Sequence, residues 1–199
     1  MLPPIVILAS GSGSNLQSII DHVNGGQVKA KIMAVISDNP DAKALERAQA
    51  AGIESVLVRQ SDYPSREKWE FDLIKKISKY KPALVVLAGF MRILGERFVT
   101  HFDKRIMNIH PSLLPAYRGL NTHQRVIDAG ETEHGATVHF VTSKLDNGPI
   151  ILQRRVKVRP EDNAEKLARR VLEQEHIIYP EAIRQFLEGH ISFENPTCR

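Results

Sequence analysis

Short, uninterrupted apolar runs recur along the first half of the chain, and each is followed by a segment with helical spacing. The runs are residues 5–9, 32–36 and 83–88, and they are rich in Val, Ile and Leu. Runs of this kind are typical of strands buried on both faces, as in parallel sheets covered by helices. Alternating strands and amphipathic helices predict βαβ units with right-handed crossovers. We therefore expect an α/β fold with an open, doubly wound, mostly parallel, Rossmann-like sheet.

The remaining elements follow from the same periodicities and from turn residues. We expect helices over residues 16–23, 42–51, from an N-cap at Ser65, over 122–129 and 164–176, and a last helix after Tyr179-Pro180. Shorter strands are expected at residues 54–58, 106–110, 135–141 and 149–153. The last two flank Asn147-Gly148, a dipeptide typical of hairpin turns, which predicts an antiparallel hairpin toward the C-terminus.

Composition limits the classes of function. The chain has 199 residues, of which 42% are hydrophobic and 25% are charged, and it contains no repeats. We therefore expect one domain spanning residues 1–199. The formal charge of +4 is spread along the chain, so it suits small anionic substrates better than nucleic acid. The single cysteine, Cys198, excludes an intramolecular disulfide and fits a reducing cytoplasm. The opening apolar run is far shorter than the ~20 residues of a membrane span, so we expect a soluble protein.

A glycine-rich loop joins the first expected strand to the first expected helix. Residues 10–15 read Ser-Gly-Ser-Gly-Ser-Asn, which matches neither a P-loop nor a clean dinucleotide fingerprint. Such a loop leaves backbone N–H groups at a helix N-terminus, where a phosphate is favoured. The alternative is a simple turn in which Ser14 or Asn15 caps the helix.

The stretch from residue 106 to 119 carries the strongest chemical signal. Asn108 and His110 are two residues apart on an expected strand, so both side chains leave the same face. Pro111 ends the strand and places His110 at the carboxyl edge, where open parallel sheets bind ligands. A carboxamide donor and an imidazole that ionises near neutral pH would then lie together. The alternative is that Asn108 caps a turn and that His110 is structural.

Asn-Ile-His-Pro-Ser-Leu-Leu-Pro at residues 108–115, followed by Tyr-Arg-Gly, resembles the signature of the folate-dependent formyltransferases. The resemblance runs from the glycine loop to Glu-His-x-Ile-Tyr-Pro at residues 175–180, and it is closest to the branch that formylates glycinamide ribonucleotide in purine synthesis. It implies transfer of a formyl group from 10-formyltetrahydrofolate, through a tetrahedral intermediate, without a metal.

The resemblance also implies residue roles. The catalytic groups would be Asn108, His110 and Asp146. Without the resemblance, Asp146 beside Asn147-Gly148 would be interpreted as an ordinary turn residue. Ribonucleotide contacts would be Gly13, Ser14, Asn15, Gly89, Ile109, Pro111 and Glu175, with the glycine loop on the phosphate. Folate contacts would be Arg66, Met91, Arg92, Ile93, Leu94, Asn108, Thr142, Ser143, Lys144, Leu145 and Asp146.

The chain departs from the family pattern at two positions. Asn121 stands where a histidine is common, and Asn147 stands where a second glycine is common. Neither change removes a catalytic group, but both affect loops beside the site. The remaining histidines, His123, His134 and His139, lack metal-type spacing and are expected to be structural or exposed.

Other functions remain open on the sequence alone. A transferase acting on methionyl-tRNA or a formyltetrahydrofolate hydrolase would share the core, but each usually carries a further domain. A nicotinamide-dependent dehydrogenase would use an acidic residue after the second strand, for which Asp38 is the candidate. A non-catalytic nucleotide-binding module would not depend on His110 or Asp146. Small-molecule substrates are expected, without nucleic acid or membrane partners, and a homodimer stays open.

Overall fold

The computed structural model describes residues 1–197, so Cys198 lies outside the described residues. The chain divides into two compact units, Met1–Met107 and Asn108–Arg199. The two units are described separately.

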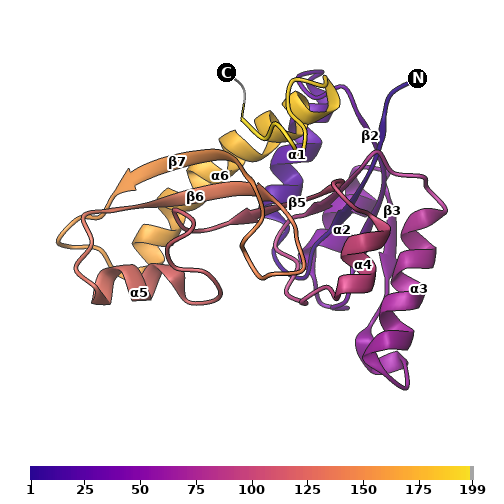
Figure 1. Ribbon diagram of the computed structural model, residues 1–199, viewed down its shortest axis with the longest axis horizontal. Coiled ribbons are helices and arrows are strands. Elements are labelled where there is room, and N and C mark those ends of the chain that lie inside the picture. The colour runs from indigo at the N-terminus through magenta and orange to yellow at the C-terminus, as the bar shows by residue number, and fades with distance from the viewer. Residues whose placement is uncertain (198–199) are drawn as a thin grey trace. The chain divides into compact units, whose positions relative to one another are not determined.

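The first unit is a parallel α/β arrangement. Its strands are β1 (Pro4–Leu8), β2 (Lys31–Ser37), β3 (Glu54–Leu57) and β4 (Leu84–Leu87), in the order β3-β2-β1-β4, and β5 (Ile106–His110) begins at its end (Figure 1). Strand β1 pairs in parallel with both β2 and β4, and β2 pairs in parallel with β3. Its helices are α1 (Ser14–Asn24), α2 (Lys43–Ala50), α3 (Arg66–Ser78) and α4 (Glu96–His101), with a 3-10 turn, η1, at Gln60–Asp62.

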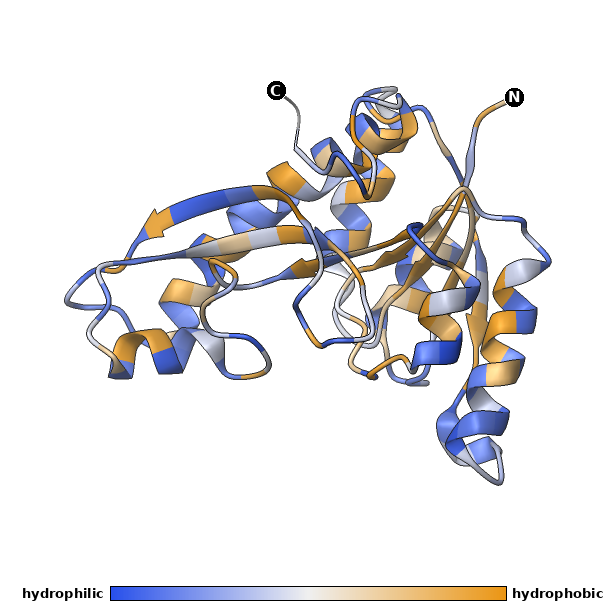
Figure 2. Cartoon of the chain, in the orientation of Figure 1, coloured by the Kyte–Doolittle hydropathy of each residue, from blue (hydrophilic) through white to orange (hydrophobic). Residues whose placement is uncertain are grey.

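The strands of this unit coincide with the apolar runs that mark the sequence. Ile5, Val6, Ile7 and Leu8 of β1 are fully buried, as are Leu84, Val85 and Val86 of β4. Figure 2 shows the strands of this unit largely in the orange of apolar residues. The N-cap expected at Ser65 is confirmed, because its side chain accepts a hydrogen bond from the Lys68 N–H.

The second unit contains the end of β5, followed by α5 (Thr122–Asp128), β6 (Glu133–Phe140), β7 (Ile150–Lys157) and α6 (Ala164–Leu187). The strand order is β5-β6-β7, and β6 and β7 are antiparallel, which confirms the expected hairpin. Helix α6 packs on both strands of the hairpin and on α5. The middle of β7 is exposed and polar, visible as the blue segment of that strand in Figure 2.

The expected break near Tyr179-Pro180 is wrong, since α6 runs without interruption from Ala164 to Leu187 with Pro180 inside it. A proline in a helix interior costs ~3 kcal/mol or more, because it removes one hydrogen bond and crowds the preceding turn. Here Ile178, Tyr179 and Ile183 are almost completely buried around it. Packing of this apolar face therefore outweighs the local preference. Helix α4 was not anticipated either.

The expected class, α/β with mostly parallel strands and an antiparallel hairpin, is confirmed. Among the described residues, no helix is both long and apolar enough to cross a membrane.

Candidate active site

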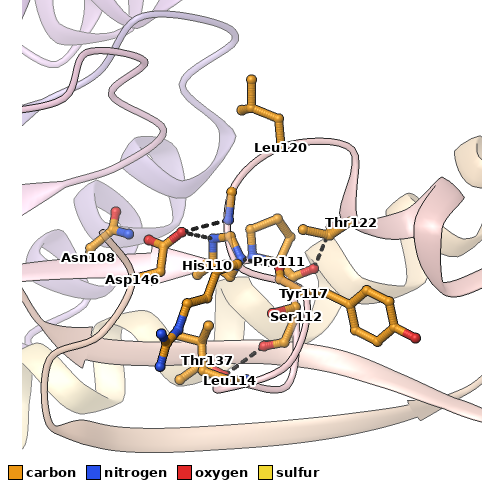
Figure 3. A network of polar contacts seen from close by, with 12 residues as sticks. Asn108, His110, Pro111, Ser112, Leu114, Tyr117, Leu120, Thr122, Thr137 and Asp146 are labelled. Carbon is orange, nitrogen blue, oxygen red and sulfur yellow. Dashed lines mark hydrogen bonds and ion pairs between the residues drawn. The ribbon is translucent and has the colours of Figure 1, made fainter. Parts of the chain in front are cut away.

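His110 and Asp146, which are distant in sequence, meet in the second unit. The His110 Nδ1 atom lies 3.5 Å from Asp146 Oδ2, and both side chains are 8% exposed. The other ring nitrogen, Nε2, lies 2.9 Å from the Tyr117 carbonyl oxygen. Figure 3 shows the carboxylate pointing toward the imidazole ring. Both ring nitrogens thus face oxygen acceptors, an arrangement that the imidazolium satisfies with its two N–H groups.

Asp146 is held by a loop contact rather than by the turn that contains it. The Gly119 backbone N–H donates to Asp146 Oδ2 at 2.9 Å, across 27 residues of sequence. The next residue, Asn147, accepts a hydrogen bond from the Arg118 guanidinium through its Oδ1 atom. Asp146 itself has a positive φ of 46°, a conformation that aspartate tolerates better than most residues. Its side chain is buried beside His110, so its geometry is that of a site residue.

These contacts also account for the two departures from the family pattern. Asn147 supplies the side-chain acceptor for Arg118, which a glycine could not. Asn121 precedes α5 with a φ of 56°, in the left-handed region where asparagine is favoured among non-glycine residues. Asn147 thus contributes a side-chain contact between two loops, whereas Asn121 suits the backbone conformation before α5.

Asn108 contacts His139, to which the sequence analysis assigned no catalytic role. Its Nδ2 atom lies 3.2 Å from His139 Nε2, and His139 Nε2 also lies 3.7 Å from Asp146 Oδ1. His139 is 2% exposed and comes from β6. The sequence interpretation grouped it with the structural histidines. The signal available was its position inside the strand expected at residues 135–141, which contains neither His123 nor His134.

Burial lowers the pKa of His139, and the nearby His110 ring acts in the same direction. The Phe140 carbonyl and the Asp146 carboxylate oppose this shift but are outweighed. His139 therefore favours the neutral form.

The loop that supplies Gly119 is fixed to β6 and α5 by hydroxyl groups. Thr137 Oγ1 donates to the Ser112 carbonyl at 2.6 Å and accepts from the Leu114 N–H at 3.1 Å. Thr122 Oγ1 donates to the Pro111 carbonyl at 2.7 Å, as the dashed line in Figure 3 shows. The loop is thus anchored on both sides of the Tyr117 carbonyl that His110 contacts.

The glycine loop of the first unit precedes α1 without any side-chain cap. The N-cap residue is Gly13, with a φ of 69°, so the interpretation of Ser14 or Asn15 as the cap is wrong. A Cβ at Gly13 would lie 2.8 Å from Ala44 Cα and 3.2 Å from Arg47 Cδ. The Arg47 Nε–H also donates to the Ser12 carbonyl at 2.8 Å. The loop therefore combines a helix N-terminus with a neighbouring guanidinium, a suitable environment for an anion.

Gly13→Ala is expected to weaken binding of a phosphorylated ligand about tenfold or more, because a Cβ introduces strain of roughly 1–3 kcal/mol and a backbone clash. Calorimetric titration with the ribonucleotide measures this. Gly26→Ala is the matched control, since Gly26 also has a positive φ but a Cβ there meets nothing within 4 Å. Equal affinities for the Gly13→Ala and Gly26→Ala proteins would contradict a binding role for this loop.

Two of the residues expected to contact folate, Arg66 and Arg92, form polar contacts within the first unit. The Arg66 guanidinium donates to the Ile93 carbonyl at 2.8 Å, and Arg92 Nε lies 2.5 Å from Asp38 Oδ2. Met91 and Ile93 in the same run are exposed, whereas Leu94 is buried. Ser10 Oγ donates to the other oxygen of Asp38 at 2.5 Å. Asp38 is buried with both oxygens engaged, so it is poorly placed to bind the ribose of a nicotinamide cofactor.

The remaining predicted residues are distributed over both units. In the first, Gly89 has a φ of 74° and its carbonyl accepts from the Ser10 N–H at 3.0 Å. In the second, Ile109 and Glu175 are each 7% exposed, and Pro111 follows β5 directly. Thr142 Oγ1 donates to the Lys144 carbonyl at 3.2 Å, while Ser143 and the large Leu145 side chain are exposed. Among the described residues, no group of three His, Cys, Asp or Glu side chains could hold a metal ion.

His123 and His134 form a separate pair, with His123 Nδ1 3.0 Å from His134 Nε2. Burial, reinforced by His123 and His110, lowers the pKa of His134 from 6.5 to about 4. Between pH 6.5 and about pH 4, His134 is therefore protonated in the unfolded chain but not in the folded chain. The free energy of unfolding consequently falls as the pH drops from 6.5 toward 4.

We expect His134 to lower the free energy of unfolding by about 2 kcal/mol between about pH 7 and about pH 5. Urea denaturation at both pH values measures the change, and His134→Gln should remove this contribution. An unaltered pH dependence in the variant would show that His134 titrates normally in the folded protein.

Comparison with known proteins identifies the family. A model of the formyl transferase family matches residues 4–183. Phosphoribosylglycinamide formyltransferase of Escherichia coli (strain K12) is 49% identical over 94% of this chain and 88% of that protein. The trifunctional purine biosynthetic protein adenosine-3 of Drosophila melanogaster is 40% identical over 93% of this chain but 14% of its own length. The crystal structure of glycinamide ribonucleotide transformylase 1 from Symbiobacterium toebii superposes with a TM-score of 0.96, at 45% identity, over 100% of this chain and 93% of that chain. The chain belongs to the formyl transferase family.

Proposed function

We propose that this protein is a phosphoribosylglycinamide formyltransferase, which transfers a formyl group from 10-formyltetrahydrofolate to the amine of glycinamide ribonucleotide. The observation that carries this proposal is the convergence of His110, Asp146 and, through His139, Asn108 in the second unit. The high identity to a phosphoribosylglycinamide formyltransferase supports the choice of acceptor. We further propose that residues 1–199 act as one formyltransferase domain.

The folate co-substrate supplies an activated formyl group, and the chain supplies hydrogen bonds and proton transfer. When the amine attacks the formyl carbon, negative charge develops on the carbonyl oxygen. One Nδ2 hydrogen of Asn108 is directed to His139. The second Nδ2 hydrogen makes no hydrogen bond among the described residues, and we propose that it donates to this oxyanion. A preorganised donor of this kind stabilises a charge that exists only near the transition state.

We propose that His110 acts on the developing negative charge and that Asp146 takes part in proton transfer. In the described geometry His110 uses both ring nitrogens within the protein, on Tyr117 and on Asp146. Direct donation from His110 to the oxyanion therefore requires that one of these contacts open. Asp146 Oδ1 makes a looser contact, 3.7 Å from His139, and is the oxygen we propose to accept the proton from the attacking amine.

We propose binding roles as the family resemblance implies. The ribonucleotide would be bound by Gly13, Ser14, Asn15, Gly89, Ile109, Pro111 and Glu175. The folate would be bound by Arg66, by residues 91–94, by Asn108 and by residues 142–146. Within the first unit, the exposed apolar side chains of Met91 and Ile93 suit the aromatic ring system of a folate. We place the reaction in the cytoplasm, without nucleic acid, membrane or metal.

The decisive test is loss of 10-formyltetrahydrofolate, followed spectroscopically with and without glycinamide ribonucleotide. We expect rapid turnover only when both are present, with formylglycinamide ribonucleotide formed in equal amount. Turnover independent of the ribonucleotide would indicate a hydrolase. Turnover with methionyl-tRNA in its place would indicate a different acceptor.

A further inference from the structure

Two histidines approach the same carboxylate from different strands. His110 of β5 faces Asp146 Oδ2, and His139 of β6 faces Asp146 Oδ1. The two rings differ in their second contacts, because only His139 also meets the carboxamide of Asn108. This difference indicates separate tasks for the two rings.

The contacts of His139 determine which of its nitrogens carries hydrogen. His139 Nδ1 lies 2.8 Å from the Phe140 carbonyl oxygen, and a carbonyl can only accept. Nδ1 therefore carries the hydrogen, and in the neutral ring Nε2 is left as an acceptor. The Asn108 atom at 3.2 Å from Nε2 is Nδ2, so the amide donates and the ring accepts.

We propose that His139 is a positioning residue that orients the Asn108 carboxamide, so that its second Nδ2 hydrogen, and not its oxygen, faces the reacting formyl oxygen. This inference rests on the proposed function. Without an acceptor at His139, the carboxamide can rotate by half a turn and present Oδ1 to the oxyanion. Two negatively polarised oxygens would then face each other, and the transition state would lose its donor.

The surroundings of His139 keep the ring in the state that this task requires. A protonated ring would carry hydrogen on both nitrogens and could no longer accept from Asn108. Burial opposes protonation, and so does the neighbouring His110. The groups that face the ring and favour protonation are the Phe140 carbonyl and Asp146, and burial outweighs them.

A pair of substitutions separates this role from a merely structural one. In His139→Gln the side-chain oxygen can reach the position of Nε2, so an acceptor for Asn108 is retained. In His139→Asn the shorter amide can replace only Nδ1, so the contact with Phe140 is kept and the acceptor is lost. We expect His139→Asn to lower kcat about 100-fold with little change in KM for either substrate. We expect His139→Gln to stay within about fivefold of the parent protein.

The opposite order, with the Gln variant inactive and the Asn variant active, would show that the Phe140 contact matters and would overturn the proposal. Equal losses in both variants would do the same. His134→Gln, which alters another buried histidine of the same strand, is the matched control and should keep its kcat. Circular dichroism and thermal melting confirm that each variant is folded.

Two further measurements make the role specific to Asn108 and independent of turnover. In an Asn108→Ala background, His139→Asn should cost less than about twofold in kcat, because the group that it positions is already absent. A second full loss would overturn the proposal. Nitrogen NMR of the ring should show hydrogen on Nδ1 and a bare Nε2, and the reverse tautomer would contradict the inference. If the parent protein does not transfer formyl groups at all, the proposed function fails, whereas the NMR result still decides the tautomer.

Discussion

Replacing Asp146 by Asn is expected to lower kcat by about 10³-fold while leaving the affinity for glycinamide ribonucleotide nearly unchanged. The amide has almost the same shape and can still accept the Gly119 N–H hydrogen bond. It lacks the negative charge that faces His110 at 3.5 Å and cannot take up a proton from the attacking amine. Steady-state rates combined with calorimetric titration of the ribonucleotide separate these two effects.

Asp162→Asn provides a matched control for that experiment. The Asp162 side chain is 1% exposed and lies 2.7 Å from the Arg170 guanidinium, whose hydrogen bonds lower the pKa of Asp162 to about 2. The control replaces a buried, paired carboxylate outside the candidate site, so it should reduce stability but not kcat. A loss of only tenfold in Asp146→Asn would return Asp146 to the role of a turn residue.

The second large effect is expected for Asn108→Ala, which should reduce kcat by about 10²–10³ because a preorganised oxyanion donor is removed. Binding of the ribonucleotide should persist, since in the proposed mechanism this amide acts mainly on charge that develops during the reaction. Single-turnover measurements with enzyme in excess report the chemical step directly.

Asn163→Ala is the control for this substitution. Asn163 caps α6 by accepting from the Lys166 N–H at 2.9 Å, so its loss should cost about 1 kcal/mol of stability and leave the chemical step unaltered. If Asn108→Ala affected the melting temperature alone, Asn108 would be a structural residue, and the His139 proposal would lose its basis.

Much of the fold could be predicted because the signals were local. Unbroken apolar runs identify strands buried on both faces, and the two-residue spacing of Asn108 and His110 places both on one face of β5. The prediction of a helix break at Pro180 was wrong. The local preference of proline was outweighed by burial of neighbouring side chains, which only the packed structure reveals.

The contacts that complete the site could not be predicted in the same way. Asp146 and Gly119 are separated by 27 residues, and no periodicity relates two loops. His139 is 31 residues from Asn108, and its task depends on which ring nitrogen meets the Phe140 carbonyl. Family resemblance supplied the residue types at Asn108, His110 and Asp146, but the direction of each hydrogen bond follows from the partners that the folded chain brings together.

The hydrogen bond from Gly119 to Asp146 has a genetic consequence, because its donor belongs to the main chain. No codon change at position 119 except one to proline deletes that N–H group. Other substitutions there act by straining a backbone with a φ of 79°. In a saturation library, position 119 should therefore show graded activities with an abrupt loss at proline, whereas position 146 should tolerate almost nothing.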